Sequence, residues 1–280
     1  MSDEGGQERP SIFECVRKGF ASASNYEKVR PDYPINAVKA FLQSLRLLGS
    51  VKTVRADRVK ILELGSGTGK FTRVMLEVLK DEDVQVIASD PLGNMCEHFK
   101  RLLPDTEIIQ CVAENIGLPD ASVDVVIASQ SFHYFANATA LEEINRVLVP
   151  GGLFGIFWVM PDFSTPWMAE LWKFFAPLYK EKSIILPFEE EWKNVFSLTP
   201  RKLFSDVEED LSFSHTLPSS FDEDYNYFAS ASVIASGSES TKESLRELFN
   251  EVMKKHFKEK GIELDHFPFK IFLYWCTKAI

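Results

Sequence analysis

The sequence predicts an α/β protein built on a doubly wound, mostly parallel sheet of seven strands, with a helical cap insertion. Short apolar runs alternate with amphipathic helical runs up to residue 160, and this alternation is typical of a parallel sheet with helices on both faces. An aromatic-rich stretch then interrupts the alternation before it resumes. A glycine-rich turn follows the first apolar run, at the position where such sheets bind ligands.

The strands are predicted from apolar or alternating runs that are too short for surface helices. In chain order they cover residues 59–64, 84–90, 107–111, 123–129, 153–158, 203–216 and 267–277. Stripes of apolar residues at helical spacing predict helices at 11–30, 35–48, 92–103, 138–149, 221–234 and 241–260. Pro104 and Pro150 end two of these helices, because proline cannot continue the hydrogen-bond ladder.

These elements divide the chain into five segments. We expect a disordered tail at 1–10, an N-terminal helical cofactor lid at 11–58, a ligand-binding α/β core at 59–160, an aromatic helical insertion at 161–200, and the rest of the sheet with its helices at 201–280. Aromatic side chains often line apolar pockets, so the insertion is predicted to cover an acceptor pocket. The alternative is a pair of helices that bury their own apolar faces.

Composition excludes several classes of protein. The formal net charge is −10 without a Lys/Arg run, which disfavours nucleic-acid binding. No apolar run approaches a membrane span, and the polar N-terminus does not resemble a signal peptide. The cysteines Cys15, Cys96, Cys111 and Cys276 lie far apart, so we predict reduced thiols, no metal site and a cytoplasmic monomer or homodimer.

The glycine turn reads Glu63-x-Gly65-x-Gly67-x-Gly69 and opens a helix. Glycines let the backbone approach a ligand closely, and the first N–H groups of a helix face the same crevice. Asp90 ends the next strand, where its carboxylate can accept hydrogen bonds from two ribose hydroxyls. This half of an α/β unit therefore predicts a nucleotide-like ligand.

The turn and the acid together resemble the first two motifs of class I S-adenosylmethionine-dependent methyltransferases. The resemblance implies that Glu63, Gly65, Ser66, Gly67, Gly69 and Asp90 bind S-adenosyl-L-methionine. An NAD(P)-dependent oxidoreductase is the alternative, but its fingerprint needs the third glycine one residue later. The third interpretation of the motif is a glycine turn that binds no ligand.

Later motifs resemble the same family in the same order. By resemblance, Ala113 and Glu114 follow the third strand where the adenine is recognised, although Glu114 also suits a solvated loop. Ser129 and Gln130 end the fourth strand, where the family faces the methionine half of the cofactor. The stretches 118–124 and 146–152 resemble structural turns of the family.

The segment from Tyr26 to Pro34 resembles the lead sequence of the trans-aconitate methyltransferases, which act on small molecules. The resemblance implies that Tyr26 and Arg30 contact the cofactor's carboxylate, and an arginine offers a planar fork for such a group. Alternatively, Tyr26 packs the segment down and Arg30 pairs with a surface acid.

His133, beyond the fourth strand, is the best-placed titratable group for catalysis. It would act as a general base only for a hydroxyl or amine acceptor, since a carboxylate needs none, and the alternative is a histidine that packs beside the cofactor. We therefore predict methyl transfer to a small molecule, on a carboxylate or hydroxyl oxygen, by in-line displacement. The alternative is a non-catalytic scaffold that binds S-adenosylmethionine.

Overall fold

A central mixed sheet organises the protein in the computed structural model, which describes residues 12–21, 23–49, 58–199 and 201–279. The strands in the described residues are β1 (Val59–Leu64), β2 (Val84–Asp90), β3 (Glu107–Gln110), β4 (Val123–Ser129), β5 (Leu148–Pro161), β6 (Glu208–Asp210), β7 (Ser214–Pro218) and β8 (His266–Thr277). Their order is β3-β2-β1-β4-β5-β8-β6, with β7 also on β8. The first five strands pair in parallel, which confirms the predicted α/β class. The predicted tail at 1–10 lies outside the described residues, as does the part of the predicted lid at 50–57.

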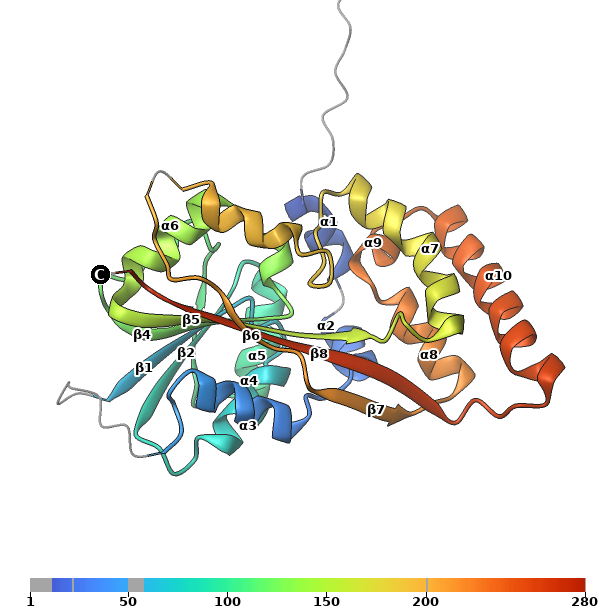
Figure 1. Ribbon diagram of the computed structural model, residues 1–280, viewed down its shortest axis with the longest axis horizontal. Coiled ribbons are helices and arrows are strands. Elements are labelled where there is room, and N and C mark those ends of the chain that lie inside the picture. The colour runs from blue at the N-terminus through green and yellow to red at the C-terminus, as the bar shows by residue number, and fades with distance from the viewer. Residues whose placement is uncertain (1–11, 22, 50–57, 200, 280) are drawn as a thin grey trace, which may run out of the picture.

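Helices cover both faces of the sheet and gather beyond one end of it (Figure 1). They are α1 (Ile12–Gly19), α2 (Ala23–Val29), α3 (Ile35–Ser44), α4 (Lys70–Val78), α5 (Gly93–Leu102), η1 (Phe132–Tyr134), α6 (Ala138–Val147), α7 (Pro166–Glu181), η2 (Glu191–Ser197), α8 (Phe221–Ala229), α9 (Ser232–Ala235), α10 (Glu239–His256) and η3 (Lys258–Lys260). Figure 1 shows α3 and α4 on one face, α6 on the other, and α7 to α10 clustered together.

Aromatic packing fixes α3 against the sheet. The Phe41 ring contacts Phe157 of β5 and Phe71 of α4 edge to face, with centroids 5.3 and 6.3 Å apart. A Cβ on Gly155 would lie 2.7 Å from Phe41 Cζ, so glycine there lets α3 approach β5. Edge-to-face pairs each add about 0.5–1.5 kcal/mol beyond the area that they bury.

The prediction of one strand over residues 203–216 is wrong in detail, because this stretch forms β6 and β7 separately. Both pair antiparallel with β8, but Asp210 lies opposite Leu273 whereas Ser214 lies opposite Lys270. An advance of four residues, from Asp210 to Ser214, therefore corresponds to an advance of only three residues along β8. The extra residue makes this a β-bulge. The Ser212 backbone N–H donates to the Asp210 carboxylate at 2.9 Å, forming the turn that interrupts the ladder. Among the described residues, the sheet thus has eight strands rather than seven.

Two predicted helices are each divided in the structure. The stretch 11–30 contains α1 and α2, separated near Gly19, where a Cβ would lie 2.9 Å from Ser232 Cα. The stretch 221–234 contains α8 and α9. Because α1 packs directly on α9, both breaks lie where these helices meet.

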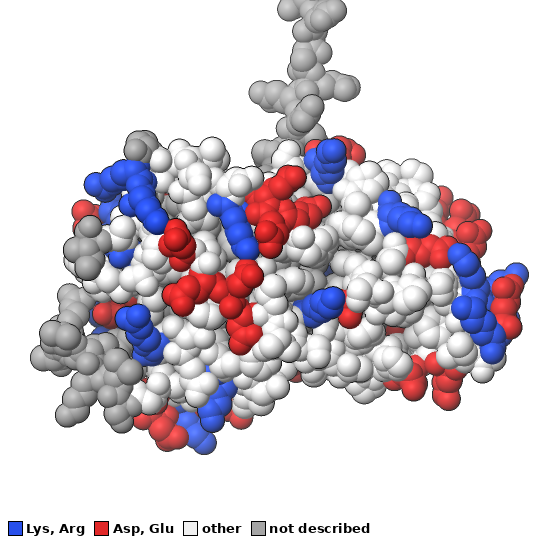
Figure 2. All heavy atoms as spheres, viewed as in Figure 1, with Lys and Arg blue, Asp and Glu red and all other residues white. Residues whose placement is uncertain are grey.

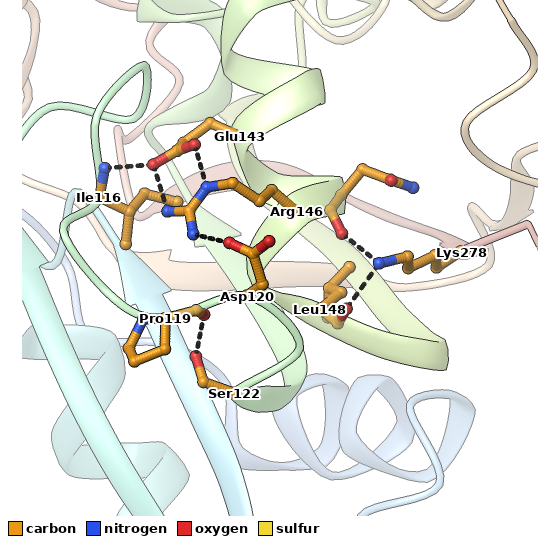
Figure 3. A network of polar contacts seen from close by, with 9 residues as sticks. Ile116, Pro119, Asp120, Ser122, Glu143, Arg146, Leu148 and Lys278 are labelled. Atoms are coloured by element: carbon orange, nitrogen blue, oxygen red, sulfur yellow. Dashed lines mark hydrogen bonds and ion pairs between the residues drawn. The ribbon is translucent and has the colours of Figure 1, made fainter.

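A polar network joins α6 to the loop before β4 and to the end of β8 (Figure 3). Arg146 donates to both Glu143 and Asp120, and Glu143 accepts from the Ile116 backbone N–H at 2.9 Å. Lys278 Nζ donates to the carbonyl oxygens of Asn145 and Leu148, which satisfies groups that a helix end leaves free. This network holds the two turns that the sequence identified at 118–124 and 146–152.

Charged side chains of both signs are interspersed on the face seen in Figure 2, with a group of acidic residues near its middle. Within the described ranges, none of the helices combines the length and apolarity needed to span a bilayer.

Candidate active site

A cavity of about 500 Å³ opens at the carboxyl ends of β1, β2 and β4. β1 has β2 on one side and β4 on the other, so the strand order reverses here, and α/β sheets bind ligands at such points. Ten of the cofactor-binding residues that the sequence predicts lie on the wall of this cavity: Tyr26, Glu63, Gly65, Ser66, Gly67, Asp90, Ala113, Glu114, Ser129 and Gln130. We call it the larger cavity, because a smaller one adjoins it.

The glycine turn forms one wall of the larger cavity. Gly65 has φ +72°, and a Cβ on it would lie 2.6 Å from Ser131 Cβ. Gly67 has φ +57°, and its Cβ would meet only Tyr26, at 3.9 Å. Both residues adopt the left-handed conformation that glycine tolerates best, but only Gly65 is also crowded.

Gly69 has a different role, because it does not line the larger cavity. Its φ is +88°, and a Cβ would lie 2.8 Å from Leu103 Cδ1 and 2.9 Å from Phe99 Cδ2. The missing side chain therefore makes room for α5 beside the start of α4. Gly69 supports the turn through helix packing.

Asp90 is buried at the end of β2 and is fixed by backbone donors. Its Oδ2 accepts from the Gly67 N–H and its Oδ1 from the Leu92 N–H, both at 2.9 Å. Desolvation outweighs these bonds and raises the pKa of Asp90 to about 6. Each carboxylate oxygen can accept a further hydrogen bond, so Asp90 is oriented and still able to bind hydroxyls.

Glu63 is a second buried carboxylate on the same cavity. Thr72 Oγ1 donates to its Oε2 at 2.6 Å, and burial raises the pKa of Glu63 to about 7. The negative charge of Asp90 adds to this rise. The site therefore favours a ligand whose positive charge or donor groups would compensate two buried acids.

The opposite wall follows β3 and β4. Glu114 is not free in solvent: its Oε1 accepts from Asn137 Nδ2 at 2.7 Å, and Asn137 in turn caps α6. Gln130 has φ +53°, which is uncommon for a residue with a side chain, and its N–H donates to the Phe157 carbonyl at 2.8 Å. Strained residues of this kind cluster at functional sites.

The segment that contains α2 lies over the cavity and is tied to α4 by ion pairs. Lys70 Nζ lies 2.8 Å from Asp32 Oδ1, and Arg73 Nη2 lies 2.6 Å from Glu27 Oε1. Tyr26, which directly precedes Glu27 in sequence, lines the cavity. Lys70 had no role in the sequence prediction, although it directly follows the glycine turn.

A second cavity of about 80 Å³, the smaller cavity, adjoins the first. It is formed by the α2 segment, η1, the end of β5, α7 and α8. Arg30 and His133 line this cavity and not the larger one. The residues that line both cavities are Phe20, Tyr26, Tyr33, Lys70, Gln130 and Tyr134.

His133 is held by a partner that the sequence prediction missed. Trp158 Nε1 lies 3.0 Å from His133 Nδ1, and an indole N–H can only donate. His133 Nδ1 must therefore accept, so the neutral ring carries its hydrogen on Nε2. Burial, followed by the positive charge of Arg30, lowers the pKa of His133 to about 3. Trp158 lies in an apolar strand that gave no sign of this contact.

The chain is similar in sequence to known methyltransferases. Residues 62–156 match the methyltransferase domain family. An uncharacterised methyltransferase of Mycobacterium tuberculosis is 33% identical over 204 residues, which cover 68% of this chain and 76% of the relative. A malonyl-[acyl-carrier protein] O-methyltransferase of Halorhodospira halophila is 31% identical over 143 residues, 49% of this chain and 45% of that protein.

Solved structures with the same fold include the YcgJ protein of Bacillus subtilis, with a TM-score of 0.55, 18% identity, and coverage of 88% of this chain and 99% of that one. A phosphoethanolamine N-methyltransferase 2 of Haemonchus contortus gives a TM-score of 0.57 and 14% identity, and the match covers 96% of this chain and 60% of that one. The fold, the cavity and these relatives define a methyltransferase. The chain belongs to the class I S-adenosylmethionine-dependent methyltransferases, and its cofactor is S-adenosyl-L-methionine rather than NAD(P).

The larger cavity fits this cofactor chemically. Ser66 Oγ and Thr68 Oγ1 are buried on its wall and have no hydrogen-bond partner among the described residues, so polar groups of a bound ligand would satisfy them. Glu63 and Asp90 offer the negative charge that a cationic sulfonium and an ammonium group require, and Asp90 also suits ribose hydroxyls.

Proposed function

We propose that this enzyme transfers the methyl group of S-adenosylmethionine to an oxygen of a small molecule bound in the smaller cavity. The observation that carries the proposal is the junction of the two cavities, whose walls have six residues in common. A cofactor in the larger cavity and an acceptor in the smaller one would meet there, beside Gln130 and Tyr134.

In this proposal, each wall of the larger cavity binds one part of the cofactor. Asp90 accepts hydrogen bonds from the ribose hydroxyls, and Ala113 with Glu114 contacts the adenine. The remaining contacts serve the methionine half, from residues on the turn, on β1 and at the end of β4: Glu63, Gly65, Ser66, Gly67, Ser129 and Gln130. Tyr26 closes the cavity from the α2 segment.

The acceptor is proposed to be small and partly apolar. A cavity of about 80 Å³ equals the liquid volume of about three water molecules, and aromatic side chains of α7 and α8 form much of its wall. Oxygen as the methylated atom is supported by the relative that is named an O-methyltransferase, although the two chains match over only about half their lengths.

Bound S-adenosylmethionine supplies an activated methyl group on a sulfonium, whose thioether leaves readily. The protein contributes alignment, and holding two reactants in a productive geometry is worth up to about 7–11 kcal/mol. The walls formed by Tyr26, Tyr33 and Tyr134 exclude water from the junction, which strengthens the local electrostatics. A carboxylate acceptor would need no general base.

We place the reaction in the cytoplasm, on a monomer or homodimer. Support comes from the four cysteines, which are all free although Cys15 and Cys276 are buried; reduced thiols are usual in the cytosol.

The proposal is tested by incubating the protein with methyl-labelled S-adenosylmethionine and a cell extract separated by size. We expect the label in the small-molecule fraction, in a product whose methyl group is released by ester hydrolysis or ether cleavage. An Asp90→Ala variant should transfer far less. Label found only in protein or RNA would contradict the proposed acceptor, and a protein that binds the cofactor but labels nothing would be a scaffold.

A further inference from the structure

Arg30 places a positive charge on the wall of the smaller cavity without a counter-ion. Its Nε is buried and has no hydrogen-bond partner among the described residues, and its Nη2 donates to the Ser230 carbonyl at 3.1 Å. Within the described ranges, no carboxylate forms an ion pair with it. An arginine cannot lose its proton in a protein, so this charge persists at every physiological pH.

Aromatic rings compensate the charge of Arg30 in part. The guanidinium carbon lies 4.9 Å from the centre of the Tyr227 ring and 5.7 Å from that of Tyr26. Cation–π contacts of this kind offset only a small part of what it costs to desolvate a cation. An anion in the cavity would complete the compensation.

The other charges on this cavity cancel. Lys70 and Asp32 both line it, but they pair with each other at 2.8 Å. His133 is neutral in the geometry set by Trp158. The guanidinium of Arg30 therefore gives the smaller cavity its net positive charge among the described residues.

His133 adds a second donor to the same cavity. Because Nδ1 accepts from Trp158, the ring hydrogen lies on Nε2, which has no partner among the residues that the structure describes. A donor at this position can bind an acceptor oxygen but cannot remove its proton. His133 is thus suited to holding an anion rather than to acting as a base.

Resting on the proposed function, we propose that Arg30 and His133 form an anion site that selects acceptors carrying a carboxylate. Arg30 would bind the carboxylate of the acceptor through its planar fork, and His133 would donate from Nε2 to the same group. Arg30 then determines acceptor specificity, in place of the cofactor contact expected from the sequence. His133 becomes a positioning residue.

The first test compares carboxylates with their uncharged amides on the full chain saturated with S-adenosylhomocysteine. Propionate and benzoate are titrated against propionamide and benzamide by calorimetry, with tryptophan fluorescence as a second readout because Trp172 lines the cavity. We expect at least one carboxylate to bind ten- to a hundredfold more tightly than its amide, as one charged hydrogen-bond partner is worth about that factor. Equal binding, or no binding of either carboxylate, would overturn the proposal.

The second test uses Arg30→Gln, which should abolish the preference for carboxylate while changing the dissociation constant of S-adenosylhomocysteine by less than about threefold. Arg246→Gln is the matched control, because its guanidinium also lies over a tyrosine ring, at 4.6 Å, but lines neither cavity. If Arg30→Gln instead weakens S-adenosylhomocysteine and spares the carboxylate, Arg30 serves the cofactor and the proposal fails. Should Arg30→Gln not fold, the comparison in the wild type still decides.

The role of His133 has its own readout. A neutral donor predicts carboxylate binding that is constant from pH 6 to 8, whereas a titrating histidine would strengthen binding as the pH falls. His133→Phe should weaken the carboxylate about three- to tenfold, the value of a neutral hydrogen bond, without changing its amide. If the protein binds S-adenosylhomocysteine but transfers no label, the result would count against methyl transfer. It would not contradict the anion site, which the carboxylate titrations test separately.

Discussion

Glu63 and Asp90 are the residues in which stability and function oppose each other. Both are buried acids with raised pKa values, so keeping them ionised costs stability when no ligand is bound. Such costs are usual at functional sites. The free energy is recovered only when a ligand with compensating charge or donors enters the cavity.

Glu63→Gln is expected to stabilise the free protein. The amide oxygen can still accept from Thr72, and the buried charge is removed. A carboxyl whose folded pKa lies above its unfolded value destabilises the fold at high pH, and this cost disappears as the pH falls from about 7 towards the unfolded value. Urea unfolding at pH 8 should show a gain on the order of 2–3 kcal/mol, shrinking to nothing near pH 4.5. A loss of stability at pH 8 would contradict this account.

Cofactor affinity should fall in acid, because Asp90 binds in its ionised form. With its pKa at about 6 in the free protein, binding releases a proton below that pH, and the affinity drops up to tenfold per pH unit. Calorimetry at pH 5 and 7.5 in buffers of different ionisation enthalpy counts the proton. Asp90→Asn should bind about ten- to a hundredfold more weakly at pH 7.5 and lose the part of the pH dependence near pH 6, while the part near pH 7 that comes from Glu63 remains. Retention of the full pH dependence in that variant would assign it to another group.

For single residues, the sequence predicted those contacts that follow from short separations along the chain. The turn glycines and Asp90 are linked by one short α/β unit, so their meeting follows from the chain order. The surroundings of Arg30 do not follow, because its partners Tyr227 and Ser230 are about 200 residues away. The bond between His133 and Trp158 likewise depends on the pairing of β4 with β5.

At the scale of elements, the glycine turn should tolerate alanine unequally. Gly65→Ala would place Cβ 2.6 Å from Ser131 Cβ in addition to straining φ, whereas Gly67→Ala strains φ without a clash. We expect a cost of about 1 kcal/mol for Gly67→Ala and about 2–4 kcal/mol for Gly65→Ala, measured by urea unfolding. Adding Ser131→Gly should recover part of the larger loss. Equal costs for the two alanines would show that the crowding is relieved some other way.

The ion pairs between the α2 segment and α4 should control how firmly the segment closes. Glu27→Gln removes the partner of Arg73, and partly exposed pairs contribute only about 0.2–1 kcal/mol. Hydrogen exchange across residues 23–34 should therefore become a few times faster, with little change in global stability. Glu239→Gln, which breaks the exposed pair with Lys242, serves as control. Unchanged exchange in the Glu27 variant would mean that aromatic packing alone holds the segment.

Elements were predicted well where period and stop signals agree, and poorly where tertiary contacts decide. The predictions for β1, β2 and β4 match the structure because these strands are short, apolar and bounded by turns. The split of 203–216 into β6 and β7 depends on their register with β8, which no local pattern records. The breaks between α1 and α2 and between α8 and α9 arise from packing of α1 on α9.

For the whole molecule, alternation along the chain was enough to predict the α/β class and the mostly parallel sheet. It could not predict that β8 would span the sheet over nine paired positions with β5, or that α7 to α10 would gather beyond one end of it (Figure 1). That gathering forms the smaller cavity from segments distant in sequence: the α2 segment, η1, α7 and α8. The acceptor side of the site was therefore harder to predict than the cofactor side.

A crystal structure with S-adenosylhomocysteine would show how the cofactor and the acceptor share the two cavities. We predict the ribose on Asp90, the adenine beside Ala113, and the sulfur at the junction of the two cavities with the Arg30 guanidinium free. A sulfur directed away from the smaller cavity, or a cofactor carboxylate bound to Arg30, would contradict this prediction.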